Sequence, residues 1–503
     1  MMTHVPGTGA VPDFDVLIIG SGAGGSAAAW RLTRAGLRVA LIEKGKDLPR
    51  DGSTLDFNQV VHAGAFRSRE PWLDGKGARF EPEEHFNVGG KTRWYGAALL
   101  RYGRHEFVAD TEHQCPGWPI THDDLAGYYE QAEKLLGVRH FDCEPDLQAI
   151  SRRLEKSGTG WKSEPIPLGL SADILRNPLE ARHFDGFASV AGLKADAETG
   201  FLDHVRASAN LTLFGDAAVA ELLPAGDDAL AVGGVRLEDG RILTGRAVLL
   251  AAGALHSPRL LQHYVERHGL AGRLPASRHI GRNLKMHLLT AMVALSPGTK
   301  TDLLRKTTIY LNGHLPHSSV QPLGFDGELI GTLMPAWVPR WLARPIGERA
   351  YGFFLQTEDG AHPDNCVRAS TAATQGLPQL DYDAGRTPAA LAEHRQLVRR
   401  FRGALVRAGM ISFSQRIGNA GTAHVSGTLS AGADPETSVV DARGRVHGMR
   451  GIYVTDGSVL PRSSRVNPSL TIYAWSLRVA DLLADGLVDR KVEVVAHREA
   501  VTP

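Results

Sequence analysis

The stretch VLIIGSGAGGSAAAWRLTRAGLRVALIEKG at residues 16–45 decides the fold of this chain. It starts as an apolar run of strand length, passes through a glycine cluster into a helical segment, and ends in a second strand. Gly20, Gly22 and Gly25 have the GxGxxG spacing of a dinucleotide-binding turn, where a helix N-terminus faces a pyrophosphate. Glu43 closes the second strand, where a carboxylate can accept from a ribose hydroxyl. The pattern predicts a dinucleotide-binding βαβ unit; the alternative is a glycine-rich turn without a ligand.

The composition is typical of a globular protein that is too long for one ordinary core. The chain has 503 residues, of which 43% are hydrophobic and 22% charged, so we expect two domains or one large domain with insertions. The net charge of +1 and the lack of a basic run indicate no nucleic-acid partner. No apolar stretch approaches the length of about 18 residues that a membrane span needs, so we expect no span.

Two features favour a cytoplasmic location. Residues 1–15 lack the charged region and the apolar stretch of a cleaved signal peptide. Cys115, Cys143 and Cys366 are few and far apart, which fits a reducing compartment. The same spacing excludes a disulfide framework and a cysteine-rich metal site. We therefore expect a cytoplasmic protein that binds no metal.

The distribution of strand-like runs favours FAD over a nicotinamide cofactor. A nicotinamide enzyme usually continues its sheet directly downstream, but residues 46–200 show no further alternation of strands and helices. Strand-like runs return only at 210–223, 231–262 and 451–461. One nucleotide-binding fold interrupted by long insertions suits FAD, whose extended form needs several chain segments along its length.

Five ordered motifs resemble those of the glucose–methanol–choline (GMC) flavoprotein oxidoreductases. They are the opening βαβ unit, VGGKTRWYGAALLRY at 88–102, AAGALHSPRLL at 251–261, HIGRNLKMH at 279–287, and a C-terminal stretch from GTAHVSGTLSAG at 421–432 to residue 483. The motifs span nearly the whole chain, whereas 130–200 and 290–410 match only loosely.

The resemblance implies an α/β fold with a discontinuous, Rossmann-like FAD domain of the glutathione-reductase type. We expect this domain in residues 12–100, 205–290 and 412–490. An interleaved α+β substrate domain, built on an antiparallel sheet, is expected in residues 101–204 and 291–411, with tails at 1–11 and 491–503.

The resemblance also indicates which residues contact FAD. For Ala252–Gly253 and Asp456–Gly457 the alternative is an ordinary turn after a strand, but the family places both pairs against the cofactor. Pro468 opens an amphipathic helix whose free N–H groups suit the negative charge of a reduced flavin. The expected FAD-binding residues are Gly20, Gly22, Ala23, Gly25, Glu43, Lys44, Gly90, Thr92, Tyr95, Gly96, Ala97, Ala98, Val219, Ala252, Gly253, Asp456, Gly457, Pro468 and Ser469.

Oxidation of an alcohol by hydride transfer to flavin N5 requires a base for the hydroxyl proton. A neutral histidine suits this task, and His424 lies in the Gly/Ser/Thr-rich turn where the family has its catalytic histidine. Asn467 occupies the position of the second family residue, His or Asn; an amide orients the hydroxyl but exchanges no proton. The alternatives are a structural turn histidine and an asparagine that only caps the helix.

The substrate is less clearly marked. Gln356 and Glu358 would project from one side of a strand within 351–368 and suit a polyhydroxylated ligand, although a solvated loop explains them equally well. The motifs resemble the bacterial pyranose- and glycoside-oxidase-like branch, which implies oxidation of a secondary sugar or glycoside hydroxyl to a ketone. The alternatives are a dehydrogenase of a non-sugar alcohol, a non-redox lyase of the same fold and a flavin-binding sensor.

Two further expectations concern the cofactor and its surroundings. Some pyranose-type relatives carry a flavin-bonded histidine just before the tryptophan of the second motif, but here Arg93 precedes Trp94, so we expect non-covalent FAD. Electrons leave to oxygen or to an external acceptor, because the chain has no heme-attachment motif. The stretch 334–347 is either an active-site lid or a partner surface.

Overall fold

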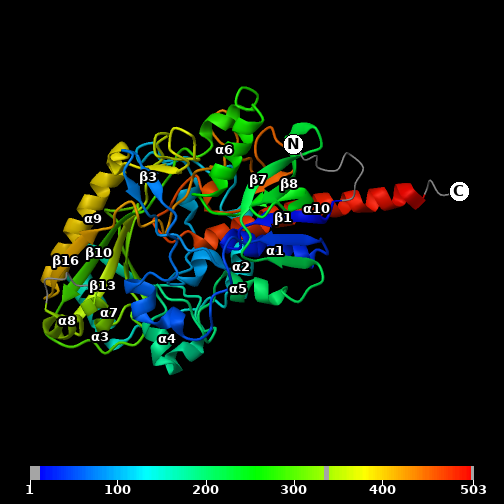
Figure 1. Ribbon diagram of the computed structural model, residues 1–503. Helices are drawn as coiled ribbons and strands as arrows, with labels where there is room; N and C mark the ends of the chain where they lie inside the picture. The colour runs from blue at the N-terminus through cyan, green and yellow to red at the C-terminus, as the bar shows by residue number, and fades with distance from the viewer. Residues whose placement is uncertain (1–11, 333–338, 500–503) are drawn as a thin grey trace.

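The structure, a computed structural model, describes residues 12–332 and 339–499, and its two largest sheets lie at opposite sides of the molecule (Figure 1). The predicted tail at 1–11, part of the predicted lid or partner surface (334–338), and residues 500–503 lie outside the described residues. The remainder of that stretch forms α8 (Arg340–Gly347).

A seven-stranded sheet carries the sequence-predicted βαβ unit. Its strand order is β6-β2-β1-β9-β8-β7, and β17 pairs with β9. Strands β1, β2, β6, β9 and β17 run parallel where they pair, so their carboxyl ends lie along one edge. The bounds are β1 (Phe14–Ile19), β2 (Val39–Ile42), β6 (Leu211–Phe214), β7 (Val219–Ala225), β8 (Asp228–Leu237), β9 (Ile242–Leu250) and β17 (Ile452–Val454).

Two helices complete this layer. Residues 16–19 of β1 are buried, and α1 (Ala23–Arg34) follows directly and packs on α10 (Ser469–Glu499), as Figure 1 shows. Small buried side chains in α1, such as Ala27 and Ala28, permit this close packing. Helix α10 continues to Glu499, so residues 491–499, which the sequence placed in a tail, belong to this helix. No helix among the described residues is long and apolar enough to cross a membrane.

The second large sheet is antiparallel and has the order β16-β10-β13-β12-β11-β5. Helix α9 (Pro388–Arg407) lies along this sheet (Figure 1). Its Leu397 and Phe401 share a buried cluster with Tyr351 and Phe353 of the sheet. The strands are β5 (Trp161–Pro165), β10 (Leu288–Leu295), β11 (Thr308–Asn312), β12 (Ser318–Pro322), β13 (Ala350–Thr357) and β16 (Ile411–Arg416).

A four-stranded sheet, β14-β15-β3-β4, links the two halves. It pairs β3 (Trp72–Asp74) and β4 (Arg79–Phe80) with β15 (Gln379–Asp381) and β14 (Cys366–Arg368), so segments expected in different domains share one sheet. The remaining α-helices among the described residues are α2 (Asp123–Leu135), α3 (Pro145–Lys156), α4 (Pro178–Arg182), α5 (Ala197–Gly200), α6 (Ser257–Arg267) and α7 (Gly327–Thr332). The predicted α/β class with a second, antiparallel sheet is confirmed.

Candidate active site

The glycines of the first turn pack the backbone closely at two positions and leave room at a third. A Cβ on Gly25 would lie 1.8 Å from the carbonyl oxygen of Gly20, and Gly20 itself has φ +101°. A Cβ on Gly22, in contrast, would meet no atom within 4 Å. The turn is therefore packed tightly where helix meets strand and is open where a ligand would lie.

The open space adjoins groups that suit an anion. The first turn of α1 holds no acidic residue, and no side chain caps its N-terminus at Gly22. Gly253, which follows β9 at the same sheet edge, also has φ +84° and open space where a Cβ would be. Free helix N–H groups beside glycines that leave open space, at the carboxyl ends of parallel strands, fit a dinucleotide pyrophosphate.

Glu43 and Asp456 are buried carboxylates at this edge. Glu43 accepts from the Ser21 N–H at 3.0 Å, and burial raises the pKa of its carboxyl group. Asp456 accepts from the N–H groups of Gly253 at 2.8 Å and Ser458 at 2.9 Å, so it fastens the chain after β9 to the chain after β17. Both residues stand where FAD is expected, and their direct contact with it stays a prediction.

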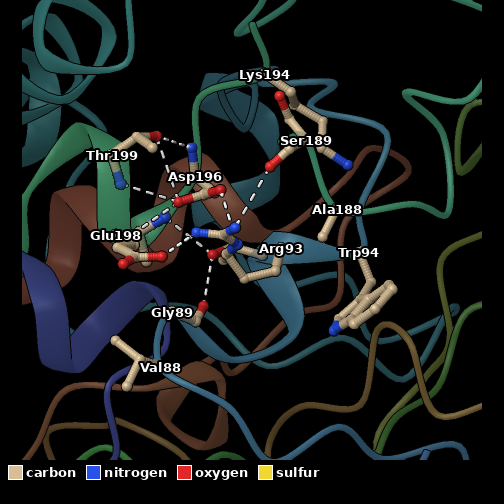
Figure 2. Close-up of polar contacts among 12 residues, drawn as sticks. Val88, Gly89, Arg93, Trp94, Ala188, Ser189, Lys194, Asp196, Glu198 and Thr199 are labelled. Carbon is tan, nitrogen blue, oxygen red and sulfur yellow. Dashed lines mark hydrogen bonds and ion pairs between the residues drawn. The ribbon is translucent and has the colours of Figure 1, made fainter. Parts of the chain in front are cut away.

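The second motif is held by a buried ion-pair cluster, which Figure 2 shows. Arg93 is 3% exposed and pairs with Glu198 and with Asp196 at 3.3 Å. Its neighbour Thr92 donates to the Gly89 carbonyl at 2.6 Å. These contacts join the segment that carries the predicted residues Gly90, Thr92, Tyr95, Gly96, Ala97 and Ala98 to helix α5 and the residue before it.

The other predicted FAD residues follow the same sheet edge. Gly45 and Glu43 accept backbone hydrogen bonds from 216 and 217, which brings Val219 to the end of β2. Lys44 is exposed and pairs with Glu70 at 3.3 Å. Ser469 is the first residue of α10, directly after Pro468.

His424 lies against a second histidine. Its Nδ1 is 2.7 Å from Nδ1 of His287, and the two rings meet edge to face at 86°. Burial holds the pKa of His424 well below its ordinary value, and the nearby ammonium groups of Lys306 and Lys91 lower it further. The imidazole is therefore neutral at neutral pH, as a base must be.

Asn467 is fixed by a residue that sequence reasoning missed. Gln321, on β12, donates from Nε2 to Oδ1 of Asn467 at 2.6 Å. Among the described residues, none accepts from the Asn467 amide nitrogen. The sequence gives no signal for Gln321, because the mostly polar segment SSVQP at 318–322 shows its complete burial only in the structure.

Comparisons with known proteins agree with a dinucleotide-binding site at this sheet edge. A family model described as FAD dependent oxidoreductase matches residues 15–274, and one described as GMC oxidoreductase matches residues 361–476. The chain is 30% identical to 6'''-hydroxyparomomycin C oxidase of Streptomyces lividus, over 96% of this chain and 93% of that protein. The chain belongs to the GMC oxidoreductases. It is an FAD-dependent oxidoreductase that acts on CH–OH groups.

Two more comparisons extend the GMC assignment. Paromamine 6'-oxidase of Streptomyces fradiae is 31% identical, over 95% of this chain and 92% of that protein. Among solved structures, pyridoxine 4-oxidase from Mesorbium loti superposes with a TM-score of 0.65 at 18% identity and covers 93% of this chain and 98% of its own. The structural likeness shows the fold alone.

The two residues predicted to bind substrate lie inside the GMC fold. Gln356 is 2% exposed and donates to the Arg465 carbonyl at 2.7 Å. Glu358 is fully buried and accepts from Arg462 at 2.8 and 2.6 Å and from His317 at 2.8 Å. Their contact with substrate stays a prediction. In the structure each has a partner, Arg465 or Arg462, in the chain just before Asn467.

His287 is the second residue that sequence reasoning missed. It ends the quoted HIGRNLKMH motif, but the sequence assigned it no role. His287 helps to line a cavity of about 420 Å³, together with Leu289 of β10, Arg416 of β16 and Tyr382. His287 therefore contacts His424 and also borders this cavity.

Proposed function

We propose that this GMC oxidoreductase oxidises a hydroxyl group of a sugar or glycoside, with His424 as the base and Asn467 as the orienting group. The observation that carries the proposal is that a neutral His424 is linked through His287 to the turn that leads to Asn467, whose amide Gln321 holds. The two Streptomyces relatives, an oxidase of 6'''-hydroxyparomomycin C and an oxidase of paromamine, support a sugar-like substrate.

Each side chain has a separate task. When bound, FAD supplies the acceptor for the hydride at N5. His424 takes the hydroxyl proton, while the Asn467 amide nitrogen donates a hydrogen bond to the same oxygen and holds the carbon–hydrogen bond in line. Gln321 binds the Asn467 carbonyl oxygen and so keeps it turned away from the substrate. The amide nitrogen, which is a donor, then faces the substrate oxygen.

The cofactor is proposed to be bound non-covalently. Arg93 stands at the position where some relatives carry a flavin-bonded histidine, and its guanidinium is occupied by Asp196 and Glu198 (Figure 2). Oxygen or an external acceptor then takes the electrons. The three free cysteines fit the expected cytoplasmic, reducing setting.

Two hydroxyl classes are candidates. The motif resemblance favours a secondary hydroxyl, which would give a ketone. The names of the relatives specify 6' and 6''' positions, and position 6 of a hexopyranose is a primary alcohol, which would give an aldehyde.

Anaerobic mixing of the holoenzyme with D-glucose, methyl β-D-glucopyranoside, paromamine, choline and benzyl alcohol tests the proposal. We expect the flavin absorbance to bleach with a sugar or glycoside and the product to identify the oxidised carbon. Bleaching only with a non-sugar alcohol would refute the substrate class, and a lyase would bleach with none.

His424→Ala tests the base. We expect FAD to be retained and flavin reduction to slow by about 10²–10⁴-fold, the usual worth of a positioned base. The loss should fall on the reduction rate rather than on the substrate Kd, because the base acts in the transition state. Reduction at a near-normal rate would remove His424 from the mechanism.

A further inference from the structure

We propose that His287 is a positioning residue that selects the tautomer of His424 and leaves its Nε2 as the nitrogen that accepts the substrate proton. The inference rests on the proposed role of His424 and adds which atom acts and what decides it. It follows from the chemistry of the groups that surround the His287 ring.

The proton on His287 is located by its neighbours. Nε2 lies 3.1 Å from the carbonyl oxygen of Ser463 and 2.7 Å from that of Ser464. A carbonyl oxygen only accepts, so Nε2 must carry the hydrogen. In a neutral imidazole the other nitrogen, Nδ1, then holds a lone pair and is an acceptor. Burial lowers the pKa of His287, which keeps the ring neutral.

This arrangement determines the proton on His424. Its Nδ1 is 2.7 Å from Nδ1 of His287, which can only accept, so His424 Nδ1 must donate. His424 therefore carries its hydrogen on Nδ1 and its lone pair on Nε2. A free imidazole exchanges between two tautomers, and only this one presents an acceptor on the side away from His287.

The two carbonyls that start this relay are held firmly. Ser464 is a non-glycine residue with φ +66°, a conformation that needs support from its surroundings. Its N–H donates to Glu358 at 3.2 Å and its hydroxyl donates to Glu106 at 2.5 Å. Arg462 adds a buried ion pair to Glu358. The strained turn is thus fixed from two sides, and its carbonyls point at His287.

The ring nitrogens of His424 can be observed directly. In the holoenzyme labelled with ¹⁵N-histidine, the His424 signals are assigned by their loss in His424→Ala. We expect a protonated Nδ1 and an unprotonated Nε2 in the wild type. The reverse assignment would overturn the proposal, and this reading does not depend on activity.

Two variants test what selects the tautomer. His287→Leu removes the acceptor, so we expect His424 signals from both tautomers and reduction slower by about 10–100-fold, below the full worth of the base. His287→Gln keeps a donor for the serine carbonyls and an acceptor for His424, so it should restore a single tautomer and most of the rate. The assay measures flavin reduction by whichever sugar of the panel reduces the wild-type flavin fastest.

His394→Leu is the matched control. His394 is also a buried histidine with two polar partners. It lies in α9 and contacts two threonines of the sheet below, Thr290 at 2.8 Å and Thr357 at 3.0 Å. It should cost stability without changing the His424 signals. A changed tautomer in this control, or wild-type signals and rate in His287→Leu, would overturn the inference. If His287→Leu does not fold, the wild-type spectrum and His287→Gln decide.

The failure of each proposal is distinguishable. Near-normal reduction in His424→Ala would remove the base and leave the tautomer result standing. Slow reduction in His424→Ala combined with an unchanged His287→Leu would leave the base in place and remove only the positioning role.

Discussion

The glycine-rich edge of the seven-stranded sheet and the histidine pocket beside it are built by different means. At the edge, backbone groups form the surface, and the decisive residues are neighbours in one βαβ unit. In the pocket, side chains from four separate segments meet: His287, Gln321, His424 and the turn at 463–467. The edge requires the absence of side chains at its glycines. The pocket requires polar groups that form hydrogen bonds with one another.

This difference determines how each region tolerates change. A backbone surface fails when a side chain fills it, because the backbone has nowhere to move. A buried polar cluster fails when one partner is lost, because the remaining group keeps its desolvation penalty. The following substitutions test that contrast, from the largest expected effect to the smallest.

Arg462→Met should produce the largest loss of stability and would show that the pocket depends on charge pairing. It leaves the fully buried Glu358 without its main partner. We expect the free energy of unfolding to fall by about 3–5 kcal/mol, measured by urea denaturation of the holoenzyme. The double variant with Glu358→Gln should recover much of this loss. If Arg462→Met alone lowers the free energy of unfolding only as much as the loss of a surface ion pair does, the contrast is contradicted.

Gly25→Ala tests the backbone surface. Its new Cβ would collide with the Gly20 carbonyl, so we expect a loss of about 1–3 kcal/mol and poor retention of FAD. The control is Gly127→Ala in α2, which meets open space and should gain about 0.5–1 kcal/mol because alanine favours helix. The flavin-to-protein absorbance ratio and the melting temperature report the result; equal behaviour of the two variants would refute the packing argument.

Asn467→Ala tests an orienting contact on the pocket side. Losing one neutral hydrogen bond is worth about 0.5–1.5 kcal/mol, so flavin reduction should slow by about 2- to 13-fold. Asn467→His should recover part of the rate, since it restores the other residue that the family has at this position. A loss as large as that of His424→Ala would mean that Asn467 does more than orient the hydroxyl.

The pH profile should show the smallest effect. Burial and the neighbouring charges lower the pKa of His424, so its neutral form persists to a lower pH than that of a free imidazole, whose pKa is about 6.5. Stopped-flow reduction should therefore be flat from about pH 6 to pH 8 and decline only in more acidic buffer. A half-loss of rate near pH 6.5 would show that the pocket does not perturb His424.

Much of the site could be predicted because its signals are local. The spacing of Gly20, Gly22 and Gly25 describes one turn, and the family motifs mark the segments that carry His424 and Asn467. His287 and Gln321 gave no comparable signal, since nothing in the sequence says that residue 287 faces 424 or that 321 faces 467. Glu358 was noticed for its charge, but its partner Arg462 lies 104 residues further along the chain, so no local pattern links the two.

The sequence by itself determined the βαβ unit, the cofactor class and the family, because each depends on residue types at short fixed spacings. Only the tertiary structure decided which groups surround His424, how the strained Ser464 turn is supported, and that β3 and β4 join β14 and β15 in one sheet. The physical reason is that a hydrogen bond between distant segments depends on packing, and packing leaves no periodic trace in the sequence.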